Sequence, residues 1–173
     1  TSTFANAVIV SGQKSEEYNR NLLNKRKPIF KAYQSTRDIL KQTNFKFQNR
    51  KRNTINILYF SRIIKLKGLD YLIEAFSTIN NNPKTKLIIV GDGNFREHCE
   101  KLVYKLRLKN VSFIGSINNE DAWRYYLISD IFVLPNSGIG GKEGWGLVIN
   151  EAASMSLPII TTDAVGASGD MVI

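Results

Sequence analysis

Two glutamates, Glu143 and Glu151, lie in and just after a segment that holds five glycines between positions 138 and 146. Glycine costs about 0.5–1 kcal/mol per residue where a regular element is required, so this composition favours a backbone that approaches a ligand closely. If a helix begins near Gly146, its free N–H groups point at that ligand, and Glu151 lies about one turn into the helix. Two carboxylates would then contact different parts of one polar ligand. The alternative is a flexible loop in which Glu143 caps the helix and Glu151 lies on the surface.

A second group of residues is basic and follows another predicted strand. Arg62, Lys65 and Lys67 stand between the strand at 55–60 and a predicted helix that begins at Gly68. The unpaired N–H groups and the dipole at a helix N-terminus favour an anion, so basic side chains there suit a phosphate. The guanidinium of Arg62 can contact two oxygens at once. A solvated basic turn explains the same residues, and this motif alone leaves both interpretations open.

A third loop, Val90-Gly91-Asp92-Gly93, is superficially similar to a dinucleotide-binding glycine loop. It has only two of the three glycines of that motif, and Arg96 stands where the third should fall. A tight turn from strand to helix explains the two glycines better.

These three loops fall where apolar runs end, in a chain that alternates between strand and helix patterns. The predicted strands are at 7–11, 28–33, 55–60, 87–90, 111–114, 131–134 and 158–162, and the predicted helices are at 13–25, 68–79, 94–108, 119–128 and 146–155. Largely apolar strands separated by helices indicate a parallel sheet that is covered on both faces. The predicted fold class is therefore α/β with a doubly wound parallel sheet, in which ligands bind at the carboxyl ends of the strands.

The spacing of apolar residues in the predicted helices indicates the face that packs inward. The residues expected on that face are Tyr18, Leu22 and Leu23 in the helix at 13–25, Leu69, Leu72, Ile73, Phe76 and Ile79 in the helix at 68–79, and Cys99, Leu102, Val103 and Leu106 in the helix at 94–108. Asn118 or Asn119 is expected to cap the helix at 119–128.

The net charge of +9 on 173 residues is concentrated in one part of the chain. Residues 1–54 hold 12 basic and 3 acidic side chains, whereas residues 55–173 hold 12 of each. The stretch 34–53 is polar, basic and poor in apolar periodicity, so we interpret it as a linker or loop, with a possible helical turn at 38–42. A basic pI that comes from one segment is weak support for nucleic-acid binding.

Composition excludes several other classes of protein. With 43% hydrophobic and 23% charged residues the chain has an ordinary globular composition, and its apolar runs are too short for a transmembrane helix of about 20 residues. The single cysteine, Cys99, excludes an internal disulfide and fits a small core residue. The single histidine, His98, leaves too few soft ligands for an all-protein zinc site and fits a surface position.

The segment around Glu143 and Glu151 carries a resemblance to a known family. The stretch EGWGLVINEAASMSLPIITTD, at 143–163, resembles the signature of retaining glycosyltransferases with the GT-B fold, of the family 4 type (glycosyl transferases group 1). Other stretches match that family in order and spacing, namely FSRIIKLKG at 60–68, IIVGDG at 88–93, FIGSI at 113–117 and SDIFVLPN at 129–136. The resemblance implies that this part of the chain is the family's Rossmann-like C-terminal domain.

The resemblance also implies roles toward a nucleotide-sugar donor. Arg62 and Lys67 would bind the diphosphate, whose negative charge grows as the sugar leaves. Glu143 would be the catalytic residue that faces the donor sugar, contacting its hydroxyls and stabilising positive character at the anomeric carbon. The other donor contacts implied are those of Glu151 with the ribose hydroxyls, of the Gly146 and Leu147 N–H groups with the phosphates, and of the backbone near Ser116 and Ile117 with the base. The scheme requires no metal and no cofactor, and the sugar would keep its anomeric configuration.

The division of the chain follows from the same resemblance. Residues 1–53 would be the end of an N-terminal acceptor domain and a basic linker, and residues 54–173 a nucleotide-sugar-binding C-terminal domain that is truncated at its end. We expect this piece of a longer chain to bind the donor without turnover. The acceptor would be a saccharide or a lipid-linked molecule, and the location cytoplasmic, with contact at the inner membrane face. The basic residues that could meet anionic lipids are Lys25, Arg26, Lys27, Arg50, Lys51 and Arg52.

Two alternatives remain open from the sequence. A GT-B-like nucleotide-sugar epimerase would share the architecture but not the transfer reaction, although the two glutamates with the basic loop favour a transferase. A nucleic-acid-binding module built on the basic segment would need aromatic residues among its charges, and from Lys25 to residue 53 only four are present, without a recognised reading motif. We therefore expect no nucleic-acid partner.

Overall fold

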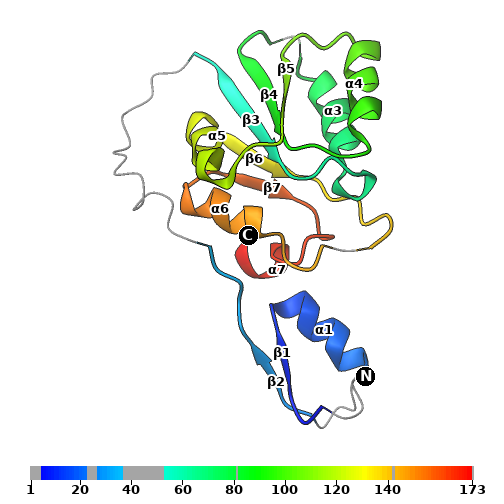
Figure 1. Ribbon diagram of the computed structural model, residues 1–173, viewed down its shortest axis with the longest axis vertical. Helices are drawn as coiled ribbons and strands as arrows, with labels where there is room; N and C mark the ends of the chain where they lie inside the picture. Colours follow the sequence, from blue (N-terminus) through cyan, green and yellow to red (C-terminus); the bar gives the residue numbers. More distant parts are fainter. Residues whose placement is uncertain (1–4, 23–26, 37–52, 81, 142, 173) are drawn as a thin grey trace.

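The computed structural model describes residues 5–22, 27–36, 53–80, 82–141 and 143–172. These residues form a small sheet of two strands near the N-terminus and a larger sheet of five strands. Figure 1 shows the larger sheet between two layers of helices, with the small N-terminal unit next to one end of this body. The predicted α/β fold class is confirmed.

The larger sheet contains β3 (Ile55–Phe60), β4 (Thr85–Val90), β5 (Val111–Gly115), β6 (Ile131–Leu134) and β7 (Ile159–Thr161). Its strand order is β5-β4-β3-β6-β7, and every pair is parallel. The chain adds β4 and β5 on one side of β3 and then crosses to the other side for β6 and β7. The sheet is therefore doubly wound, and its strand order reverses at β3.

Helices cover both faces of this sheet (Figure 1). One face packs against α3 (Leu69–Ser77) and α4 (Arg96–Lys105), and the other against α5 (Ala122–Ile128) and α6 (Leu147–Ser154). Successive residues of a strand point to opposite faces, so Tyr59 of β3 joins the first core and Leu58 the second. Cys99 of α4 is fully buried in the first core, which confirms its predicted place.

Short helical segments complete the larger unit. The 3₁₀ turn η2 (Lys65–Lys67) precedes α3, the 3₁₀ turn η3 (Asn119–Asp121) precedes α5, and α7 (Ser168–Met171) follows β7. Among the described residues, none of the helices has the length and apolar character needed to cross a bilayer.

The N-terminal unit consists of β1 (Val8–Val10), α1 (Gln13–Leu22) and β2 (Ile29–Lys31), and its two strands are parallel. The elements were predicted, but the expectation that Tyr18 and Leu22 face inward is wrong. These side chains are 65% and 56% exposed, and α1 has no buried residue. A sheet of only two short strands offers too little apolar surface to cover the helix. Leu23 lies outside the described residues.

Two smaller expectations are also wrong. Ile79 is 45% exposed because α3 ends at Ser77, two residues before the apolar stripe does. Asn118 makes no side-chain capping bond, and the segment after it begins with the 3₁₀ turn η3. The predicted turn at 38–42 and the basic residues Lys25, Arg26, Arg50, Lys51 and Arg52 lie outside the described residues.

Candidate functional site

The loops after β3 and β6 meet at the point where the strand order reverses. The Ser137 N–H donates to the carbonyl of Leu66 at 2.8 Å, and its hydroxyl donates to the same oxygen at 3.1 Å. Gly68 lies so close to the second loop that an added Cβ would stand 2.0 Å from the carbonyl oxygen of Pro135. The backbones therefore touch here, at the place where a doubly wound sheet opens its ligand crevice.

Lys67 and Glu143 form an ion pair between these two loops, although they are 76 positions apart in the sequence. The Lys67 side chain is only 8% exposed, whereas the Glu143 side chain is 24% exposed. The Glu143 backbone is held by the segment after β7. Its N–H donates to the Ala164 carbonyl at 2.9 Å, and its carbonyl accepts from the Gly166 N–H at 3.0 Å. The pair places a cation suited to phosphate oxygens beside a carboxylate suited to hydroxyl groups.

The start of α6 lies next to the Glu143 side chain. Gly146 has a φ of 90°, which favours glycine, and a Cβ built there would lie 3.5 Å from the Glu143 Cγ and 3.0 Å from Val165. No described side chain caps the helix that begins at Leu147. An uncapped helix start beside a buried lysine is a favourable environment for an anion.

Glu151 lies four residues after Leu147, so both residues share one face of α6. Its Oε2 atom accepts a hydrogen bond from the Tyr126 hydroxyl at 2.6 Å. Tyr126 is fully buried on α5. Burial is the larger of two causes that raise the pKa of the Tyr126 phenol well above its ordinary value, and the neighbouring Glu151 carboxylate is the other. The phenol therefore remains a hydrogen-bond donor.

The loops after β3, β4 and β5 are joined in a row along the same edge of the sheet. The Ser61 N–H donates to Val90 at 3.1 Å, and the Gly91 N–H donates to Gly115 at 2.9 Å. A Cβ on Gly91 would stand 2.0 Å from the Ser61 carbonyl, which confirms that this glycine serves a tight turn. Arg62 follows Ser61 and is exposed at this edge, with its carbonyl accepting a 3.0 Å hydrogen bond from the Tyr59 hydroxyl.

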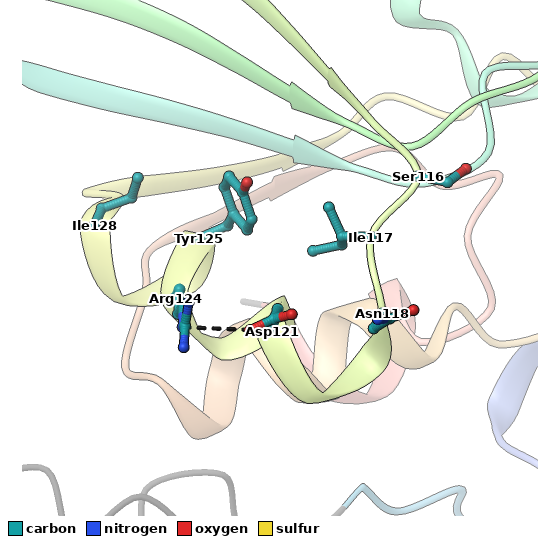
Figure 2. A pocket seen from close by; sticks show the side chains of 7 residues that line it. All are labelled: Ser116, Ile117, Asn118, Asp121, Arg124, Tyr125 and Ile128. Atoms are coloured by element: carbon teal, nitrogen blue, oxygen red, sulfur yellow. Dashed lines mark ion pairs between the residues drawn. The ribbon is translucent and has the colours of Figure 1, made fainter.

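A pocket of about 530 Å³ lies between the loop after β5 and α5. Figure 2 shows Ile117 and Tyr125 pointing toward one another across it, and Ser116 where the chain leaves β5. Asp121 and Arg124 form a 3.4 Å ion pair on the outer rim, so the wall combines apolar and polar groups. Ser116 and Ile117, the residues predicted to meet a base, are therefore part of a pocket.

The structure brings together most of the predicted residues, and it adds others that the sequence did not single out. Lys67 contacts Glu143, Gly146 lies beside Glu143, and Arg62 lies on the same loop as Lys67. Tyr126 was missed because an aromatic residue in a helix next to a sheet usually serves the core.

Asn136 was also missed as an individual residue. It is 1% exposed, and neither atom of its side-chain amide has a hydrogen-bond partner among the described residues. A buried amide of this kind needs partners, since leaving it unpaired costs about 1–3 kcal/mol. Its position two residues after the apolar strand β6 was the available signal. His98, by contrast, is exposed on α4 and stacks on Phe95, as expected for a surface residue.

Comparison with known proteins identifies the family of the chain. Residues 41–173 match the family described as "Glycosyl transferases group 1". The chain is 30% identical over 171 residues to an uncharacterized glycosyltransferase of Methanocaldococcus jannaschii, covering 92% of this chain and 40% of that one. It is 33% identical over 111 residues to the GDP-mannose-dependent monoacylated alpha-(1-6)-phosphatidylinositol monomannoside mannosyltransferase of Corynebacterium glutamicum, covering 62% of this chain and 29% of that one.

Solved structures support the same relationship. Sucrose-phosphate synthase from Thermosynechococcus elongatus superposes with a TM-score of 0.77 at 27% identity, covering 98% of this chain and 43% of that one. The chain thus spans less than half the length of each of these three relatives. Their names favour neither an epimerase nor a nucleic-acid-binding protein. On its family match and its GT-B-like sheet, the chain belongs to the glycosyl transferases group 1 family.

Proposed function

We propose that this chain is the donor-binding part of a glycosyltransferase that moves a sugar from a nucleoside-diphosphate sugar to an acceptor. The observation that carries the proposal is the Lys67–Glu143 pair at the point where the strand order reverses. It places a cation, a carboxylate and an uncapped helix start within one short stretch of the sheet edge. A diphosphate linked to a sugar has complementary parts, namely an anion followed by a set of hydroxyl groups.

The rest of the donor follows the row of loops. The diphosphate lies between Lys67, Arg62 and the N–H groups of Gly146 and Leu147, and the sugar faces Glu143. The base lies against the pocket beside Ser116 and Ile117, and the ribose hydroxyls lie near Glu151. The row runs from the loop after β6 to the loop after β5, which also lines the pocket, so each part of an extended ligand has its own group of contacts.

Donor binding changes the partner of Lys67. In the free chain its ammonium pairs with Glu143. A diphosphate offers it a stronger, doubly charged partner, and the released carboxylate of Glu143 then accepts hydrogen bonds from sugar hydroxyls. As the bond between the sugar and the phosphate breaks, Lys67 and Arg62 stabilise the growing negative charge, and Glu143 stabilises positive character at the anomeric carbon.

The transferred sugar keeps its anomeric configuration, as in the family 4 type of enzyme, and transfer requires no metal and no cofactor. Residues 54–173 form the nucleotide-sugar-binding domain, and residues 1–53 are the end of the acceptor domain and the basic linker. The acceptor is a saccharide or a lipid-linked molecule. The enzyme works in the cytoplasm, in peripheral contact with the inner membrane face.

Calorimetric titration of the chain with UDP, GDP, ADP and their sugars tests the proposal. We expect one of the three nucleotides to bind, and we expect the nucleotide sugar with the same base to bind as well. Absence of heat from all of them, in a sample whose circular dichroism shows a folded α/β protein, would refute it. Because catalysis needs an acceptor domain as well, no transfer is expected from this chain alone, and binding is the appropriate measurement.

A further inference from the structure

Tyr126 is a buried residue whose polar end reaches the candidate site. Its ring packs in the core of the α5–α6 face, 5.4 Å from the ring of Phe60 and 5.9 Å from that of Phe132. Its hydroxyl donates to Glu151 Oε2 at 2.6 Å, a short separation that is typical of a hydrogen bond to a charged carboxylate. A phenylalanine would fill the same space, so the packing does not explain the hydroxyl.

Glu151 has one carboxylate oxygen held and one available. Oε2 accepts from Tyr126, whereas Oε1 has no hydrogen-bond partner among the described residues. The side chain is partly exposed, and side chains on a helix lean toward its N-terminus, which here lies beside Glu143 and Gly146. The hydrogen bond from Tyr126 therefore fixes which oxygen faces the core and which faces the crevice.

We propose that Tyr126 is a positioning residue that holds the Glu151 carboxylate in one orientation, with Oε1 presented to the vicinal hydroxyl pair of the donor ribose. The inference rests on the proposed function, because it assumes that a nucleotide occupies this site. Tyr126 does not touch the donor. It removes the rotational freedom of the carboxylate before binding, so the entropy of ordering that side chain is not lost on binding.

The substitution Tyr126→Phe tests the inference because it removes the hydroxyl and keeps the ring. The titrants are the nucleoside diphosphate that the wild-type chain binds and its 2′,3′-dideoxy analogue. We expect Tyr126→Phe to weaken binding of the normal nucleotide about threefold to tenfold, because the Glu151 side chain must then be ordered when the nucleotide binds. The analogue lacks the hydroxyls that Glu151 would contact, so its affinity should differ by less than about twofold between variant and wild type.

Two control variants separate positioning from a structural role. Tyr104→Phe removes a hydroxyl from an 86% exposed tyrosine on α4 and should leave both affinities unchanged. In a chain that already carries Glu151→Gln, adding Tyr126→Phe should weaken binding much less than it does in the wild type, because the two residues act as a unit.

Two results would overturn the inference while the proposed function stands. One is equal weakening of the normal nucleotide and the dideoxy analogue by Tyr126→Phe, which would indicate a structural role. The other is no weakening of either. If the wild-type chain binds no nucleotide at all, the proposed function itself fails, and this inference fails with it.

Discussion

Lys67 is the charged residue on which the proposed donor binding depends most. A buried ammonium is stable only with a partner, and in this chain the partner is Glu143. Lys65, two residues earlier in the same turn, is exposed. The two lysines share a charge and a loop but differ in burial, and this difference makes them a matched pair for testing the site.

We expect Lys67→Met to weaken binding of a nucleoside diphosphate by about tenfold to a hundredfold, since it removes a charge-assisted contact with the phosphates. Lys65→Met should change the affinity less than about threefold. Calorimetric titration with the diphosphate and with the corresponding nucleoside measures this. The nucleoside has no phosphate, so Lys67→Met should leave its affinity unchanged, and a loss for both ligands would contradict the assignment of Lys67 to the diphosphate.

At the scale of elements, the site depends on close contact between the loops after β3 and β6. Gly68 and Gly140 both have a positive φ, 65° and 84°, but only Gly68 faces another backbone, at Pro135. A Cβ on Gly140 would meet nothing within 4 Å. The cost of the backbone conformation is therefore common to both positions, and the steric contact belongs to Gly68 alone.

Gly68→Ala should lower the free energy of unfolding by at least about 3 kcal/mol, because the two loops must separate. Gly140→Ala should lower it by about 1 kcal/mol, the cost of a left-handed residue with a side chain. Urea unfolding followed by circular dichroism measures both values. Equal losses in the two variants would show that the loops are not in the contact described.

Cys99, on α4, makes the free energy of unfolding depend on pH in the alkaline range. Burial, then the nearby carboxylates of Asp70 and Glu100, raise the pKa of its thiol from 9.0 to about 12. The unfolded chain loses this proton above about pH 9 while the folded chain keeps it. The resulting stabilisation is therefore fully present below pH 9 and is lost as the pH rises from 9 toward 12.

The free energy of unfolding of the wild-type chain should fall between pH 9 and 10, with a contribution from Cys99 of up to about 1.4 kcal/mol per pH unit. Cys99→Ala removes the titrating group, so its curve should be flatter in the same window. Urea unfolding at pH 8, 9 and 10 compares the two proteins. Identical slopes would show that the thiol is not held protonated.

The elements of the larger sheet could be predicted from sequence because each strand is a largely apolar run that ends at a glycine, a proline or a polar residue. The position of β3 matches its predicted range, and β4 begins two residues early, at Thr85, where the alternation with exposed Lys86 weakens the apolar signal. The exposure of α1 could not be predicted. The apolar residues of α1 are spaced as in an amphipathic helix, but this spacing does not reveal how much sheet is present to cover the helix.

The candidate site could be predicted only in part. The residue types of Arg62, Lys67, Glu143 and Glu151 indicate a phosphate and a polar ligand, and the strand pattern places them at one edge of a sheet. The contact of Lys67 with Glu143 depends on β6 lying beside β3, which is a choice of topology that no local pattern encodes. The hydrogen bond from Tyr126 to Glu151 is likewise a tertiary contact, between residues that lie 25 positions apart on two different helices.

At the scale of the whole molecule, the N-terminal unit touches the glycine-rich loop and the segment after β7. The Gln13 N–H donates to Asp170 at 2.9 Å, and a Cβ on Gly12 would stand 2.5 Å from the Trp145 ring. The Asn150 side chain joins the two parts of the chain, since it accepts from the Trp145 indole N–H at 2.7 Å and donates to the Gln34 carbonyl at 2.8 Å. Trp145 therefore connects the loop that carries Glu143 with the unit that carries α1.

The charge excess of residues 1–54 leads to a prediction for the intact chain. We expect binding to vesicles that contain anionic lipid at low ionic strength, and release as salt screens the attraction. Replacing Arg50, Lys51 and Arg52 with glutamine should reduce binding, at about 1 kcal/mol per removed charge. Co-sedimentation with anionic and with neutral vesicles measures it, and an equal response to both would contradict a role for these charges.

We propose that the edge of the sheet around Lys67, Glu143 and Glu151 binds a nucleotide-sugar donor. The most direct measurement is calorimetric titration of the wild-type chain, Glu151→Ala and His98→Ala with the nucleoside diphosphate that the wild type prefers. Glu151 lies at the site, whereas His98 is exposed on α4 and stacks on Phe95. We predict that Glu151→Ala weakens binding about tenfold or more and that His98→Ala binds as the wild type does. Equal affinities for the two variants would contradict donor binding at Glu151.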